Sequence, residues 1–199
     1  MRPRQIMAML GSVALIGAAV AVAPVESRDL DMIIDDFSSG GLVSQVGTRW
    51  SGVSDQVMGG ISQVVLTKCT AQDEPCLRLT GDVRIENNGG FIQAALDLTE
   101  DGRTFDASSY KGIRLVVQGN GEEYGLHLRT SDITRPWQSY RAQFRAGSDW
   151  EVIELSFSDF ASHMIDVPLN TQKLRRLGLI AIGRQFHADL SVKRLEFYR

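Results

Sequence analysis

The sequence predicts an all-β protein, an antiparallel β-sandwich or jelly roll that carries one or two short helices. The chain holds 19 glycines in 199 residues and lacks a long apolar stripe of helical period. About ten short segments rich in branched and aromatic residues follow one another, with turn signals between them. Within several of these segments apolar and polar residues alternate. This alternation is typical of strands that have one face in a core and the other in water.

The expected strands follow one another along the chain after residue 31. They span residues 32–37, 61–68, 76–79, 91–98, 112–118, 124–131, 138–144, 150–157, 177–182 and 191–198. The sequence Gly119-Asn120-Gly121 marks a hairpin connection between two of them. A short helix is expected around residues 157–164 and a helical turn around residues 170–175.

The first 27 residues form a segment of their own, ahead of a single domain expected at residues 28–199. Arg2 and Arg4 precede an apolar run at residues 6–23, which ends in small residues. This is the order of a secretory signal, so we expect export to a periplasm. If the run is not cleaved it is a membrane anchor, although a membrane span needs about 20 residues. A mitochondrial transit peptide would instead be amphipathic and rich in arginine.

The charge of the chain argues against nucleic acid as a partner. The chain holds 21 basic and 24 acidic residues, and its formal net charge is −3. Nucleic-acid binding requires clustered lysine and arginine, and the sequence contains no such run.

The only two cysteines, Cys69 and Cys76, are expected to form a disulfide, because an even count in an exported chain favours one. The residues between them have the composition of a turn, so the bond would join the two strands of a hairpin. A redox pair is the alternative, but the spacing is not C-x-x-C. Two thiols alone also fall short of a zinc site.

One candidate binding site is a polar face of the sheet. Alternation in residues 124–131 and 138–145 places polar side chains opposite the apolar ones. The polar face holds His127, Arg129, Arg141, Gln143 and Arg145, with Trp137 close by in sequence. An aromatic ring beside a few polar groups is typical of a sugar or anion cleft. The simpler interpretation is a solvated sheet face, since charged residues usually face water.

A second candidate is the loop at residues 50–62. Gly59-Gly60 permits positive φ and a close approach of the backbone. Asp55 is expected to accept hydrogen bonds from backbone amides of the turn, with Trp50 and Met58 packed beneath it. This interpretation is structural. In the functional alternative, the loop meets residues 87–91 and shapes a protein-binding edge. The candidate residues of that edge are Trp50, Asp55, Met58, Gly59, Gly60, Ser62, Gly89, Gly90 and Phe91.

No residue pattern indicates a cofactor, a catalytic metal or catalysis. A structural calcium ion is an open alternative, because Asp and carbonyl oxygens suit calcium, although no EF-hand pattern exists. The candidate ligands are Asp35, Asp36, Asp97, Asp101 and Asp106. His127, His163 and His187 are far apart in sequence and lack the spacing of metal ligands. The motifs G-x-S-x-G and H-E-x-x-H are absent from the sequence. We therefore expect a protein that is not an enzyme and that carries neither a cofactor nor a metal.

Four segments together match the motifs of one family. Residues 50–62 carry Met-Gly-Gly, residues 87–91 carry a second glycine pair, and residues 119–124 and 150–160 follow. The chain resembles the complex I intermediate-associated protein family, whose best-known member is a mitochondrial assembly factor for respiratory complex I. Ser156 stands where the family usually has proline. The resemblance implies a β-sandwich related to galactose-binding and carbohydrate-binding modules, without an established catalytic site.

The resemblance implies non-catalytic binding, as an assembly or chaperone-like factor for a protein partner. The alternative is a carbohydrate-binding module on an exported protein. A third possibility, a hydrolase, would need paired acid and base groups in a cleft. The best-known family member works on the matrix side of a membrane, whereas this chain carries the pattern of an export signal. Protein binding needs an apolar or sheet-edge patch, and sugar binding needs exposed aromatic rings.

Overall fold

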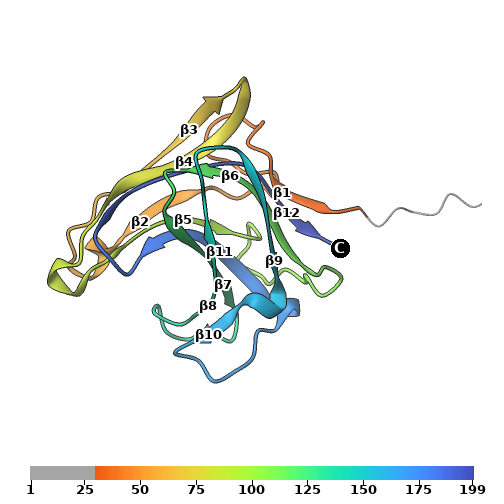
Figure 1. Ribbon diagram of the computed structural model, residues 1–199. Coiled ribbons are helices and arrows are strands. Elements are labelled where there is room, and N and C mark those ends of the chain that lie inside the picture. The colour runs from red at the N-terminus through yellow and green to blue at the C-terminus, as the bar shows by residue number, and fades with distance from the viewer. Residues whose placement is uncertain (1–29) are drawn as a thin grey trace, which may run out of the picture.

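The computed structural model describes residues 30–199, which fold into two packed antiparallel sheets (Figure 1). Sheet I has the strand order β3–β4–β12–β6–β9, and β1 also pairs with β12. Sheet II has the order β10–β8–β7–β11–β5–β2. The expected all-β sandwich is thus confirmed.

The elements have the following bounds. Sheet I contains β1 (Met32–Asp35), β3 (Val65–Ala71), β4 (Glu74–Val83), β6 (Gly112–Gly119), β9 (Glu151–Ser156) and β12 (Phe186–Tyr198). Sheet II contains β2 (Ser51–Ser54), β5 (Phe91–Asp97), β7 (Glu123–Thr130), β8 (Ser139–Arg145), β10 (Ala161–His163) and β11 (Leu174–Ile182). Four 3₁₀ helices lie within the described residues: η1 (Asp55–Met58), η2 (Glu86–Asn88), η3 (Phe157–Asp159) and η4 (Thr171–Lys173).

The core lies between the inner faces of the two sheets, and the expected alternation places its side chains there. Trp50, Tyr124, Tyr140 and Phe197 are among the largest fully buried residues. Buried tyrosines need partners for their hydroxyl groups. The hydroxyl of Tyr124 donates to the Asn120 side chain at 2.6 Å, and that of Tyr140 donates to the Val167 carbonyl at 2.9 Å.

The segment predicted as a helix at residues 157–164 is mostly extended. Ser156 and Asp159 form a capping box, which starts a helix, but only the single 3₁₀ turn η3 follows. The chain then continues as the edge strand β10, in which Ala161 pairs with Arg141 of β8. Pairing with a sheet edge outweighs the local capping signal here. Strands β2 and β10, each at an edge of sheet II, were not predicted.

The hairpin of β3 and β4 carries the expected disulfide. Cys69 and Cys76 face each other across the two strands and are bonded. Gln72 and Asp73 form the turn, and both have positive φ, as a two-residue hairpin loop of type I′ requires. The disulfide predicted from the sequence is confirmed.

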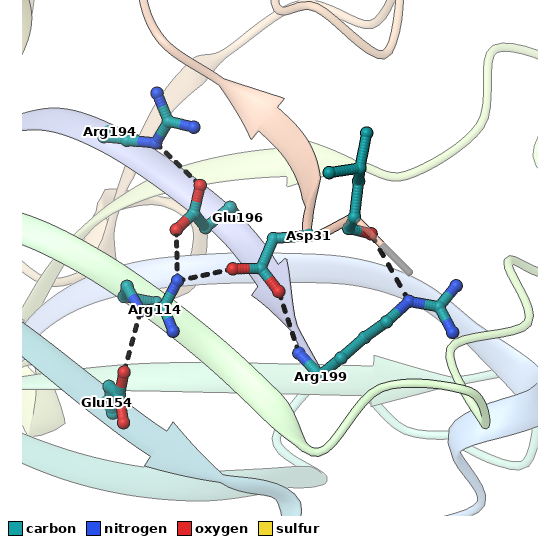
Figure 2. Close-up of polar contacts among 7 residues, drawn as sticks. Asp31, Arg114, Glu154, Arg194, Glu196 and Arg199 are labelled. Carbon is teal, nitrogen blue, oxygen red and sulfur yellow. Dashed lines mark hydrogen bonds and ion pairs between the residues drawn. The ribbon is translucent and has the colours of Figure 1, made fainter. Parts of the chain in front are cut away.

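The two ends of the described chain lie together on sheet I (Figure 2). The backbone N–H of Arg199 donates to the Asp31 carboxylate at 2.9 Å. The guanidinium of Arg114 contacts three carboxylates, those of Asp31 at 2.6 Å, Glu154 at 2.8 Å and Glu196 at 2.7 Å. These bonds hold β1 against β6 and β12. Within residues 30–199 no helix is long and apolar enough to cross a membrane, and the apolar run at residues 6–23 lies outside the described residues.

Candidate functional site

A groove with a volume of about 630 Å³ runs over the outer face of sheet II, the face opposite the core. Its floor consists of β5, β7, β8 and β11. The loop that precedes β8, with Trp137, borders the groove at one end, and η1 with the loop before β5 borders it at the other. The two sites that the sequence suggested separately, a polar sheet face and a glycine loop, thus belong to one groove.

Strand register places the arginines of the groove in two neighbouring rows. Arg129 of β7 lies opposite Arg176 of β11, and Arg176 lies opposite Asp97 of β5. In the next row on the same face, Arg141 of β8 lies opposite His127 of β7. Side chains two residues apart on a strand share a face, so both rows open into the groove. This part of the groove is called the arginine end below.

The other end of the groove is apolar. Ile180 and Ile182 of β11 and Phe91 of β5 lie further along the same face, beyond the arginine rows. Val57 and Met58 of η1 border this end, and their side chains are exposed. This part is called the apolar end below.

Small residues keep the middle of the floor low. A Cβ atom added at Gly178 would lie 1.8 Å from the Gln93 side chain, so Gln93 lies flat across β11 at this point. Likewise a Cβ at Gly125 would lie 2.9 Å from Ile180 and 3.3 Å from the imidazole of His127. Side chains larger than hydrogen at Gly178 and Gly125 would lift the neighbouring groups into the groove.

The buried carboxylate of Asp55 fixes the two loops at the apolar end. Its Oδ1 accepts the backbone N–H of Ser62 at 2.9 Å. Its Oδ2 accepts the Ser62 hydroxyl at 2.5 Å, the Gly90 N–H at 2.5 Å and the Phe91 N–H at 3.3 Å. Burial alone would raise the pKa of Asp55, but these four hydrogen bonds outweigh it and hold the pKa below its usual value.

The two glycine pairs fit around this carboxylate in the same way. In each pair one residue has positive φ: Gly59 at 93° and Gly90 at 125°. The other residue lies against Asp55, where an added Cβ would come within 2.3 Å at Gly60 and 2.4 Å at Gly89. The expected positive φ and the expected close backbone approach are therefore both present. They bring the η1 loop against the loop before β5.

The groove is cationic and has no internal counter-charge. Among the described residues that line it, none is Asp or Glu. Arg176 is paired with Asp97 outside the lining, at 2.7 Å. Arg129 donates only to the carbonyls of Pro136 and Arg135, and Arg141 donates to the Ser139 hydroxyl. Arg129 and Arg141 thus lack a carboxylate partner within residues 30–199.

Burial lowers the pKa values of three basic side chains at the arginine end. Desolvation lowers the pKa of the Arg129 guanidinium, and the neighbouring Arg176 and Arg175 lower it further, while Asp97 opposes them. Desolvation also lowers the pKa of Arg141. Burial, followed by the charge of Arg141, lowers the pKa of His127 to about 3, so its imidazole is neutral at pH 7. The arginines remain charged at pH 7, because even a lowered guanidinium pKa is far above it.

The predicted site residues divide into two groups in the structure. Met58, Gly89, Gly90, Phe91, His127, Arg129, Trp137 and Arg141 line the groove. Trp50, Asp55, Gly59, Gly60 and Ser62 do not line it. Trp50 is a core residue whose indole N–H donates to Asp35 at 2.7 Å. Met58 does not pack under the loop as expected, since 61% of it is exposed.

Sequence reasoning missed the contribution of β11 to the groove. Arg176, Ile180 and Ile182 were not among the candidates, although β11 lies at the centre of sheet II. The apolar run of this strand has no polar alternation that would separate a core face from a groove face. The one available signal was the Arg175-Arg176 pair directly before that run.

The sequence matches the family described as Complex I intermediate-associated protein 30 (CIA30) over residues 37–192. The chain belongs to this family. The resemblance found in the glycine motifs is thereby confirmed, and the CIA30 region contains every strand of the groove. No curated protein matches the chain.

Solved structures with the same fold include carbohydrate-binding modules. A family 11 carbohydrate-binding module from Clostridium thermocellum, in complex with a β-1,3-1,4-mixed-linked tetrasaccharide, has 14% identity and a TM-score of 0.64. That match covers 84% of this chain and 95% of the module. The family 30 module of the cellulosomal cellulase Cel9D-Cel44B of the same organism has 17% identity and a TM-score of 0.60, covering 84% and 96% of the two chains. At these identities the likeness shows the fold alone.

Proposed function

We propose that this CIA30 domain is a non-catalytic binding domain that holds a segment of a protein partner in the groove of sheet II, in the role of an assembly or chaperone-like factor. The observation that carries the proposal is the make-up of the groove, in which methionine, aliphatic side chains and arginines lie together. Methionine and arginine are enriched at protein interfaces, and methionine adapts to partners of varied shape. The family, described by its association with an intermediate of complex I, agrees with protein binding.

A glycan is the second candidate ligand, supported by two observations. The structural neighbours include modules named for carbohydrate binding, one of them in complex with a tetrasaccharide. Trp137, 54% exposed at the groove edge, offers a ring on which a sugar can stack. The apolar end favours a protein segment, however, because beside Phe91 it holds the aliphatic side chains of Ile182 and Val57, which present no ring face.

We further propose that the domain acts outside the cytoplasm, in the periplasm, either released or anchored through residues 6–23. The apolar run behind two arginines supports export, and the Cys69–Cys76 disulfide is of a kind that persists in oxidising compartments. The partner would then be an envelope protein. Intact mass of the protein purified from envelopes tests this: loss of about 21 residues indicates a cleaved signal, and an intact N-terminus in membranes indicates an anchor.

Site-specific photo-cross-linking tests the binding role. A photoreactive amino acid replaces Met58 at the groove, or Val152 on sheet I as the matched control; each residue is 61% exposed. We expect the Met58 probe to form an adduct with a defined peptide of one envelope protein, identified by mass spectrometry, and the Val152 probe to form none.

A panel of envelope glycans completes the experiment. Binding of a glycan that is abolished by Trp137→Ala, without a protein adduct, would replace protein by sugar as the ligand. Absence of both would refute a binding role for the groove. Turnover of a glycan or ester, lost on substitution of one carboxylate or serine, would refute the non-catalytic assignment.

A further inference from the structure

The groove has a direction, because its charge and its apolar surface lie at opposite ends. Strand register places Arg129 and Arg176 in one row, and Phe91 and Ile182 in a row six residues further along the strands. At about 3.3 Å per residue these rows are roughly 20 Å apart. An extended peptide of about six residues spans that length. A single extended segment of that length would reach from the arginine end to the apolar end.

At the arginine end, two guanidinium groups have no negatively charged partner among the described residues, and a ligand can supply one. Arg129 and Arg141 are partly removed from water, yet neither has a carboxylate partner among residues 30–199. A partly desolvated charge is costly unless it is paired. Each guanidinium has donors left beyond the bonds it makes, and carboxylates are the groups that match its planar fork. Neutral His127 adds no charge of its own at this end.

The middle and the apolar end fit a peptide better than a small anion. The Gln93 amide lies across the low floor at Gly178, and it makes no hydrogen bond to another described residue. Its donor and acceptor are therefore available to a peptide group. Beyond it, Ile182 and Phe91, which are both half-buried, offer surface to aliphatic side chains. A free anion would occupy the arginine end alone and leave this surface exposed.

We infer that the groove binds an extended segment of about six residues that carries a carboxylate at one end, held between Arg129 and Arg141, and aliphatic side chains at the other, on Ile182 and Phe91. This inference rests on the proposed function and specifies the chemistry of the protein partner. The carboxylate belongs to an Asp or Glu side chain. Specificity arises because a neutral segment leaves both guanidinium groups unpaired.

Fluorescence polarisation with two short peptides tests the inference on the folded domain. One labelled, N-acetylated and C-amidated hexapeptide pool has Glu at one end and Leu or Val at the other positions. Its matched pool has Gln in place of Glu. We expect the Glu pool to bind about 10- to 100-fold more tightly, the range set by hydrogen bonds to charged groups. A third pool, with Glu at the opposite end of the peptide, tests binding in the reverse chain direction.

Substitutions in the protein show which arginines cause the preference for the Glu pool. Arg141→Gln should remove most of the preference for Glu over Gln, and Arg129→Gln should reduce it. Arg145→Gln on the same strand is the matched control, because Arg145 is exposed and lies outside the groove lining. The control should change affinity by less than about twofold, since exposed charges interact weakly. The comparison between peptide pools needs no protein variant, so it stands even if a variant fails to fold.

Equal binding of the Glu and Gln pools would overturn the inference. So would a preference that survives both Arg129→Gln and Arg141→Gln. If the Met58 probe still captures an envelope peptide in that case, the protein-binding function stands and only the acidic specificity is wrong. If neither peptides nor envelope proteins bind, the proposed function itself fails.

Discussion

Asp55→Asn should destabilise the domain strongly, because the carboxylate is the shared acceptor of two loops. The side-chain oxygen of Asn can take the place of Oδ2 and still accept the three hydrogen bonds made there. Its NH₂ group then takes the place of Oδ1 and faces the Ser62 N–H, which loses its acceptor. An unsatisfied buried donor costs about 1–3 kcal/mol, and loss of the charge weakens each of the other bonds by about 1 kcal/mol. Allowing for non-additivity, we expect a loss of about 3–5 kcal/mol.

Thermal unfolding followed by circular dichroism measures this loss. For a domain of this size each kcal/mol corresponds to about 2–4 °C, so Tm should fall by about 6–20 °C. Asp73→Asn is the control. Asp73 lies exposed in the β3–β4 turn with φ of 64°, a conformation that Asn accepts equally well, so its Tm should change by less than about 2 °C.

The pH dependence follows from the lowered pKa of Asp55. A carboxyl with a folded pKa below its unfolded value stabilises the fold fully above the unfolded pKa, about 3.9, and the contribution is lost as the pH falls through the folded pKa. The gap in stability between wild type and Asp55→Asn should therefore be constant near pH 7 and narrow below about pH 4. Equal Tm values for Asp55→Asn and Asp73→Asn, or a gap that does not narrow in acid, would refute the reasoning.

Three further predictions concern other parts of the structure. Gly60→Ala should lower the free energy of unfolding more than Gly59→Ala, as measured by chemical denaturation. The Cβ added at residue 60 would lie 2.3 Å from the Asp55 side chain. The Cβ added at residue 59 has open space around it, so Gly59→Ala costs only the strain of an alanine at a φ of 93°, about 1–2 kcal/mol. Replacing Cys69 and Cys76 together by Ser should lower the free energy of unfolding by about 2–3 kcal/mol, the chain-entropy value for so short a loop. A loss below about 1 kcal/mol, measured by urea unfolding, would contradict this prediction. In an NMR titration the imidazole of His127 should stay neutral down to about pH 4, since its pKa is lowered to about 3; protonation near pH 6.5 would mean that the side chain is exposed.

The sequence predicted the fold well wherever a strand has one buried face and one solvent-exposed face. Alternation in β7 and β8 identified the core residues Tyr124 and Tyr140 and, on the opposite face, Arg129 and Arg141. It failed at β2 and β10, because edge strands of three or four residues are too short for a period to be recognised. It also failed for β11, where both faces are apolar and only the pairing with β5 and β7 shows which residues reach the groove.

The site was predictable in composition but not in arrangement. Residue spacing suggested that Asp55 holds a turn through backbone amides, and this is its role. No local signal showed that two of these amides belong to residues 90 and 91, since the contact joins segments 35 residues apart. Trp50 and Asp35 show the same limit: the buried indole N–H finds its carboxylate 15 residues earlier, across the sandwich. Such pairs are set by packing of the sheets and not by local sequence.

The two ends of the described residues meet at Asp31 and Arg199, which makes this part of the chain suited to circular permutation. A short linker can join residue 199 to residue 30, and new ends can be opened in the exposed turn at residues 100–104. The same geometry decides how the protein is best attached to a sensor surface. A tag joined directly at residue 30 or at residue 199 starts from sheet I, so the immobilised domain keeps the groove of sheet II directed to solution.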